Sequence, residues 1–151
     1  MDPLKIDTVK LSDAGDALVI IDQTLLPNEV RYLSLTAIED IWEAIRALRV
    51  RGAPAIGVAA EFGAYLAAYY APDAELEGRF LAACDYLAAS RPTAVNLRWA
   101  VEQMLRTARE ARDQGRQAVL DALYRKAVFL HRDDMDRCAA ISRYGLSLLQ
   151  E

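Results

Sequence analysis

The segment from Pro54 to about Tyr70 constrains the fold most, because it is dense in small and aromatic residues. These are Gly57, Ala59, Ala60, Gly63, Ala64, Ala67 and Ala68, together with Phe62, Tyr65 and Tyr69. Small residues let neighbouring helices approach closely, and a helix that is apolar on most faces must be covered on several sides. Glycine within a helix costs about 0.5–1 kcal/mol relative to alanine, so the two glycines also indicate a close neighbour. We therefore predict a buried helix that ends at Ala71-Pro72-Asp73.

Helical patterns continue on both sides of this segment. Thr36 and Glu39 have the spacing of a capping box, in which Thr36 is the N-cap of a helix over 37–49. Two more helices are predicted downstream, over 74–89 and 93–114.

The last stretch of the chain, 116–149, keeps helical spacing of its apolar residues after a break at Gly115. It exceeds thirty residues, which is long for one helix of a globular protein. A bend near His131 or Gly145 is therefore expected.

The first thirty-six residues follow a different pattern. Residues 18–22 are a β-branched run, and residues 30–35 alternate with the period of a half-buried strand. Leu26-Pro27-Asn28-Glu29 supplies turn chemistry between them. A first strand is expected near 5–11, followed by a turn at 13–16. The pattern predicts a small antiparallel sheet.

Together these patterns predict an α+β chain with a β-sheet subdomain over 1–36 and a helical bundle over 37–151. At 151 residues the chain fits a single domain of ordinary size. Its net charge of −4 argues against a nucleic-acid surface. The sequence shows neither a signal peptide nor a membrane-spanning stretch, so a cytoplasmic location without membrane contact is expected.

The two cysteines and the single histidine are not expected to have a catalytic or metal-binding role. Cys84 and Cys138 are far apart in the sequence and lack CxxC spacing, so each is expected to be a small buried apolar residue. His131 has no second histidine near it, which argues against a zinc site, and no metal or cofactor is expected. The acidic residues that follow it are expected on a solvated helix face: Asp133, Asp134 and Asp136.

Two segments combine an arginine, a tight turn and a proline at a predicted helix start. They are Arg51-Gly52-Ala53-Pro54 and Ser90-Arg91-Pro92-Thr93. A helix N-terminus has unpaired N–H groups and the positive end of the helix dipole, and arginine adds a planar donor that matches phosphate. Two such starts could hold one phosphorylated ligand. The alternative is purely structural, because proline is common at helix starts and neither segment has the length of a P-loop.

Residues 50–60 and 90–97 resemble the two signature segments of the methylthioribose-1-phosphate isomerase family, and 21–27 resembles its N-terminal strand and turn. The superfamily also includes ribose-1,5-bisphosphate isomerase and the regulatory subunits of translation initiation factor two-B. The resemblance implies that the phosphosugar is bound by Arg51, Gly52, Ala53 and Arg91. It implies conversion of 5-methylthioribose 1-phosphate to 5-methylthioribulose 1-phosphate, an aldose–ketose isomerisation in methionine salvage.

The resemblance also implies a C-terminal Rossmann-like domain, which these 151 residues do not include. In the family that domain has a catalytic cysteine in a Thr-x-Cys-Asn segment, and neither Cys84 nor Cys138 lies in one. No catalytic residue is therefore predicted here, the chain alone is expected to be inactive, and the full-length protein is expected to be a homodimer. The alternative is a ribose-1,5-bisphosphate isomerase-like or initiation-factor-like regulatory module that senses a phosphorylated metabolite.

Three further residues each have two possible roles, one structural and one in substrate binding. Asn96 follows the second arginine by five residues, where its amide could bridge turns or face the substrate. The methylthio group needs an apolar pocket, for which Trp42 and Phe62 are candidates, although core packing is the commoner role of such side chains.

Overall fold

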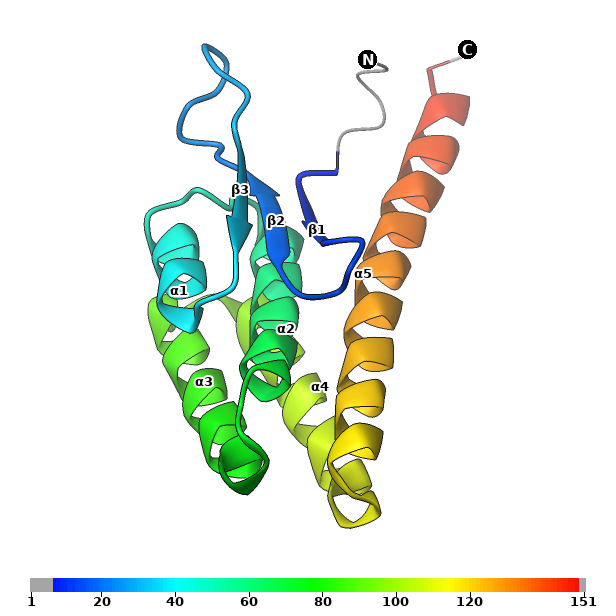
Figure 1. The fold of residues 1–151 in the computed structure, drawn as a ribbon. Helices are drawn as coiled ribbons and strands as arrows, with labels where there is room; N and C mark the ends of the chain where they lie inside the picture. The colour runs from blue at the N-terminus through cyan, green and yellow to red at the C-terminus, as the bar shows by residue number, and fades with distance from the viewer. Residues whose placement is uncertain (1–6, 150–151) are drawn as a thin grey trace.

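The computed structural model describes residues 7–149 and contains a small sheet on a bundle of helices (Figure 1). Strands β1 (Val9–Leu11), β2 (Leu18–Ile21) and β3 (Tyr32–Leu35) form an antiparallel sheet in the order β1-β2-β3. The predicted sheet is confirmed, although the expected start of the first strand at residues 5 and 6 lies outside the described residues. Leu18 and Ile20 are fully buried and join the core formed by the helices.

Helix α2 (Ala53–Tyr69) is the centre of the bundle, as predicted. It packs against the other four α-helices and against β1 and β2. Figure 1 shows α1 and α3 on one side of it, α4 behind it and α5 on the other side. Twelve of its seventeen residues are buried, because glycine and alanine allow close contact on several faces.

The capping box predicted for the first helix is wrong. Helix α1 (Ile38–Arg46) has Ala37 at its N-cap, in an extended conformation and without a side-chain cap. The start is one residue later than predicted, so Glu39 occupies the second helical position and not the third. The helix also ends three residues early, because Leu48 adopts a left-handed conformation with φ of 64°.

The next two helices have short 3₁₀ turns at their ends. Helix α3 (Leu76–Ser90) follows η1 (Asp73–Glu75), and helix α4 (Val95–Ala111) leads into η2 (Arg112–Gln114). Helix α4 begins two residues later than predicted.

Helix α5 (Arg116–Ser147) is continuous over 32 residues, so the bend expected near His131 or Gly145 is absent. His131 packs edge-to-face on Phe62 of α2, with ring centroids 5.5 Å apart, which holds the middle of α5 on the bundle. Figure 1 shows the C-terminal half of α5 extending past β1 and beyond the other helices. Among the described residues, no helix has the length and apolar character needed to cross a membrane.

Candidate functional site

The first turns of α2 and α4 lie side by side. A Cβ atom added to Gly57 of α2 would lie 3.1 Å from the carbonyl oxygen of Asn96 and 3.6 Å from Cβ of Ala100, both in α4. A Cβ atom at this distance from a main-chain carbonyl is tighter than an ordinary contact, so glycine is the residue that fits here without a shift of either helix. The two helix starts that the sequence singled out therefore meet in space.

Both helix starts have free backbone donors. Gly52, the N-cap of α2, has φ of 99°, and neither α2 nor α4 has a side-chain cap or an acidic residue in its first turn. Helix α1 differs, because Glu39 and Asp40 lie in its first turn. The N–H groups and dipole ends of α2 and α4 are thus available to an anion.

The two motif arginines are placed differently. Arg51 is exposed and directly precedes the N-cap of α2, as predicted. Arg91 is half-buried and is the C-cap of α3, three residues before the N-cap of α4. Neither side chain forms a hydrogen bond or an ion pair with any residue of 7–149. Both guanidinium groups are therefore available to a ligand.

The turn predicted at Ser90-Arg91-Pro92 is confirmed, but the helix after it starts at Val95 and not at Thr93. Ala94 donates its N–H to the carbonyl oxygen of Arg91 at 3.0 Å, which closes a turn, and Ala94 is the N-cap. Pro92 therefore lies within the turn between α3 and α4. In contrast, Pro54 does lie in the first turn of α2, where its missing N–H costs no hydrogen bond.

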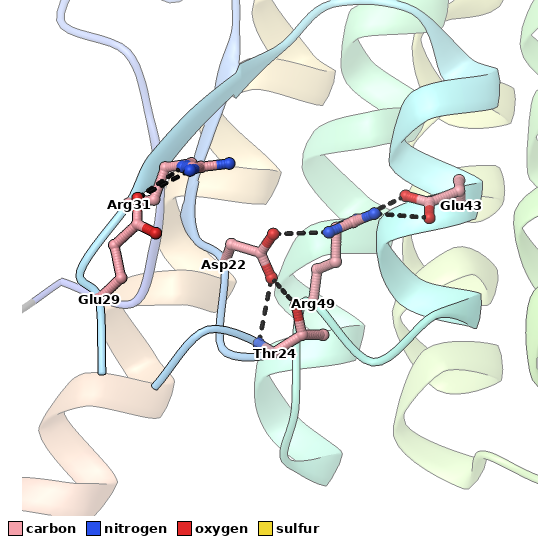
Figure 2. Close-up of polar contacts among 6 residues, drawn as sticks. All are labelled: Asp22, Thr24, Glu29, Arg31, Glu43 and Arg49. Carbon is pink, nitrogen blue, oxygen red and sulfur yellow. Dashed lines mark hydrogen bonds and ion pairs between the residues drawn. The ribbon is translucent and has the colours of Figure 1, made fainter. Parts of the chain in front are cut away.

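An ion-pair network holds the loop that precedes α2 (Figure 2). Nη1 of Arg49 lies 2.6 Å from Oδ2 of Asp22, and Nε of Arg49 lies 2.8 Å from Oε2 of Glu43. The other oxygen of Asp22 accepts hydrogen bonds from Thr24, from Oγ1 at 2.6 Å and from the backbone N–H at 3.1 Å. The bonds from Thr24, helped by Arg49, lower the pKa of Asp22.

The network ties β2, α1 and the loop together two residues before Arg51. The backbone adds two hydrogen bonds, since the N–H groups of Arg49 and Val50 both donate to the carbonyl oxygen of Ala44. Val50 is fully buried, whereas Arg51 is exposed. The sequence did not predict this network, because Asp22 and Arg49 are 27 residues apart and follow no local pattern.

A cavity of about 250 Å³ lies beside these helix starts, between α2, α4 and α5. Its lining residues include Pro54, Gly57, Glu61, Asn96, Trp99, Asp133, Asp134 and Arg137. Glu61 is only 1% exposed, and its Oε1 atom has no hydrogen-bond partner among residues 7–149. Burial, with a contribution from Asp134, raises the pKa of Glu61 to about 9.

This cavity corrects the expectation for two acidic residues of α5. Asp133 and Asp134 are half-buried and line the cavity, so they do not belong to a fully solvated face. Asp136 is exposed, as expected. The one available signal for the cavity was Glu61, a charged residue inside an otherwise apolar helix.

The cysteines and aromatic candidates lie outside this region. Cys84 is fully buried, and burial raises its pKa to about 12, so it is an unreactive core residue as expected. Cys138 is exposed on α5, so the expectation that it is buried was wrong. The two candidates for the methylthio pocket have packing roles, because Phe62 is buried against His131 and Trp42 stacks on Tyr86.

Burial lowers the pKa of His131, which favours its neutral form. Within 7–149, no group of three or more histidine, cysteine or acidic side chains is arranged to hold a metal ion.

Comparison with known proteins places these residues in a family. Residues 49–151 match the initiation factor 2 subunit family. The chain is 48% identical over 151 residues to a methylthioribose-1-phosphate isomerase of Symbiobacterium thermophilum, covering 98% of this chain and 42% of that protein. It is 47% identical over 145 residues to a 5-deoxyribose 1-phosphate isomerase of Petrotoga mobilis, and the match covers 94% of this chain and 42% of that protein.

Two solved structures share the fold. A 5-methylthioribose 1-phosphate isomerase from Pyrococcus horikoshii superposes with a TM-score of 0.80 at 32% identity, covering 85% of this chain and 37% of that one. A translation initiation factor eIF-2B subunit delta from A. fulgidus superposes with a TM-score of 0.78 at 34% identity. The match covers 87% of this chain and 38% of that one. The chain thus spans about 42% of the length of the curated relatives compared here. With more than half of its residues matched, the chain belongs to the initiation factor 2 subunit family.

Proposed function

We propose that this chain supplies the phosphate-binding part of an aldose–ketose isomerase that acts on a 5-substituted ribose 1-phosphate. The observation that carries the proposal is the uncapped N-terminus of α2, directly preceded by Arg51, which is exposed and has no ion pair with the described residues. The names of the two relatives, a methylthioribose-1-phosphate isomerase and a 5-deoxyribose 1-phosphate isomerase, support the substrate class.

Phosphate binding follows from the chemistry of this end of the bundle. The N–H groups of Gly52 and Ala53 would donate to phosphate oxygens, and the left-handed conformation of Gly52 lets the ligand approach the backbone. Arg51 would add a bidentate contact. Arg91 would approach from the turn that leads to the adjacent α4. The Asp22–Arg49 pair would keep the loop in place when the ligand is absent.

Isomerisation requires more than phosphate binding. Moving a carbonyl group between C1 and C2 needs an acid or base that can take up or release a proton at those carbons. Arginine stays protonated, so Arg51 and Arg91 can bind the substrate but cannot serve as a base. We propose that the acid–base groups belong to the part of the relatives' length that this chain does not span, and that the chain alone does not turn over substrate.

A second candidate function is a regulatory module that binds a phosphorylated metabolite without converting it. The likeness to an initiation factor eIF-2B subunit favours it, because that structure matches nearly as well as the isomerase structure. The two functions share the phosphate site and differ in whether ketose is ever formed.

The binding step can be tested by calorimetry with 5-methylthioribose 1-phosphate, and with methylthioribose as the ligand that lacks phosphate. We expect binding to depend on the phosphate. Arg51→Ala and Arg91→Ala should each weaken it by about tenfold or more, since a charged hydrogen bond contributes roughly 1.5–3 kcal/mol. Arg106→Ala is the matched control, because Arg106 is exposed on α4 more than two turns beyond its start. Unchanged affinity in both test variants would reject the phosphate site.

Catalysis is tested separately, by assaying ketose formation with the chain alone and after addition of the remaining part of a relative. We expect turnover only in the combined sample if the chain is part of an isomerase, and none in either sample if it is a regulatory module. Ketose formation by the chain alone would refute the assignment of the acid–base groups to the other part.

A further inference from the structure

We propose that the cavity between α2, α4 and α5 binds an organic cation, an alkylammonium or guanidinium group, and that Glu61 is its buried anionic partner. The inference goes beyond the proposed function and does not rest on it, because neither Arg51 nor Arg91 lines the cavity.

Glu61 is the main observation. The residue is 99% buried and lines the cavity, and one of its carboxyl oxygens has no hydrogen-bond partner in the described part of the chain. A buried polar atom without a partner costs about 1–3 kcal/mol, so a native protein rarely retains one unless another group satisfies it. A ligand with N–H donors in the cavity would satisfy Oε1.

The charge of the lining selects a cation. Three carboxyl groups line the cavity, those of Glu61, Asp133 and Asp134. Arg137 is the cationic residue among the described lining residues, and it is already paired with Asp133 at 2.8 Å. Lys126 also acts on Glu61 electrostatically, but it does not line the cavity. Once Glu61 is ionised, three carboxylates face one guanidinium group, and this excess of negative charge attracts a cation and repels phosphate.

The size and rim of the cavity favour an organic cation over a metal ion. The described residues contain no cluster of three acidic, histidine or cysteine side chains placed to hold a metal. A volume of about 250 Å³ suits an alkyl chain with a charged end. Trp99 lines the cavity and is 47% exposed, so its ring is available to stabilise a cation through its π-face.

The Glu61 end of the cavity is separate from the proposed phosphate site, although Pro54 and Asn96 at the two helix starts also line the cavity. Glu61 follows Ala53 by eight residues, which corresponds to about 12 Å along a helix axis. An anion at the N-terminus of α2 therefore does not contact Glu61, and each site can be altered without removing the other.

The test uses n-butylamine as the probe and the fluorescence of Trp99 as the signal. Trp42→Phe removes the other tryptophan, which stacks on Tyr86 at the α1–α3 contact. 1-Butanol and ribose are neutral comparison ligands, and measurements are made at pH 7 and pH 9. We expect saturable binding of butylamine that is at least tenfold tighter than that of either neutral ligand.

Variants of the same protein assign the binding to Glu61. Glu61→Gln keeps the shape of the side chain and should weaken butylamine binding at least tenfold at pH 9, with far-UV circular dichroism as the check of folding. Arg51→Ala should leave the affinity for butylamine unchanged. Affinity should rise from pH 7 to pH 9 in the parent protein and not in Glu61→Gln, because the raised pKa of Glu61, about 9, makes its carboxyl group ionise over this range. The free amine stays protonated over this range, because an alkylammonium group titrates near about 10.4.

The source of the cation is distinguished by a second probe, Nα-acetyl-lysine amide. Tighter binding of this probe than of butylamine indicates a lysine side chain of a polypeptide, and the reverse indicates a free amine. Equal binding of butylamine and 1-butanol, tighter binding of ribose, or full affinity in Glu61→Gln would each overturn the proposal.

Discussion

The backbone of Gly57 lies so close to that of Asn96 that a Cβ atom on Gly57 would be 3.1 Å from the Asn96 carbonyl oxygen. This contact sets the distance between the first turns of α2 and α4, and thus between the two groups of free N–H donors. It also explains a glycine in the middle of a buried helix, where alanine would otherwise be favoured.

Gly57→Ala should lower the free energy of unfolding, although glycine to alanine in a helix is normally favourable. The obstacle is a main-chain carbonyl, which cannot rotate away as a side chain can. Gly78→Ala is the matched control, because Gly78 lies in α3 with no atom near its added Cβ. It should raise the free energy of unfolding by about 0.5–1 kcal/mol. Urea denaturation measures both, and equal stabilisation of the two variants would show that the contact imposes no constraint.

Asp22→Asn should destabilise the protein by about 1–2 kcal/mol, since it removes a charged partner of Arg49 at a buried position. Glu29→Gln is the control, because the Arg31–Glu29 pair shown in the same close-up is half-exposed and should contribute less than about 0.5 kcal/mol (Figure 2). Thermal or urea unfolding distinguishes the two. If both substitutions lower the free energy of unfolding by a similar amount, the burial of Asp22 does not strengthen its ion pair with Arg49.

The effect of Asp22→Asn should depend on pH in a defined direction. The pKa of Asp22 in the folded protein lies below its ordinary value of 3.8, mainly because Thr24 donates hydrogen bonds to the carboxylate. Its contribution to stability is therefore complete above pH 3.8 and is lost as the pH falls through the folded-state pKa. The difference between wild type and variant should shrink in acid, and a constant difference would contradict this origin.

The interior position of Glu61 should make stability fall with rising pH. Its pKa is about 9 in the folded protein and 4.5 ordinarily, so between these values the unfolded chain loses a proton that the folded chain keeps. Stability should decrease across this window by at most about 1.4 kcal/mol per pH unit. Urea denaturation of wild type and Glu61→Gln at several pH values tests this, because their difference cancels the contribution of His131. If the difference in free energy of unfolding between wild type and Glu61→Gln stays constant from pH 5 to pH 9, the raised pKa of Glu61 is refuted.

Local patterns predicted the elements of this fold but not their ends. The composition of 54–70 was enough to predict a buried central helix, since apolar and small residues on most faces leave no solvated side. The capping box failed by one residue, because Ala37 takes the extended conformation that a cap requires and Thr36 does not serve as the cap. Caps depend on backbone angles that tertiary contacts can shift.

The candidate site was predictable only in part. The sequence indicated two helix starts, and their approach through Gly57 depends on how α2 and α4 pack. The supporting pair joins Asp22 to Arg49 across 27 residues, and the cavity combines residues of three helices. Such contacts have no spacing rule in the sequence. The assignment of Arg51, Gly52, Ala53 and Arg91 to phosphate binding stays a prediction.

The two cysteines should react with thiol reagents at very different rates. Cys138 is exposed on α5, whereas Cys84 is fully buried in α3 with its pKa raised to about 12. The thiolate is the reactive form, so the native protein should incorporate one equivalent of iodoacetamide quickly and the second only on unfolding. Mass spectrometry of labelled peptides identifies the site, and Cys138→Ser is the control, which should show no fast labelling. Fast modification of Cys84 in the folded protein would mean that α3 opens locally without global unfolding.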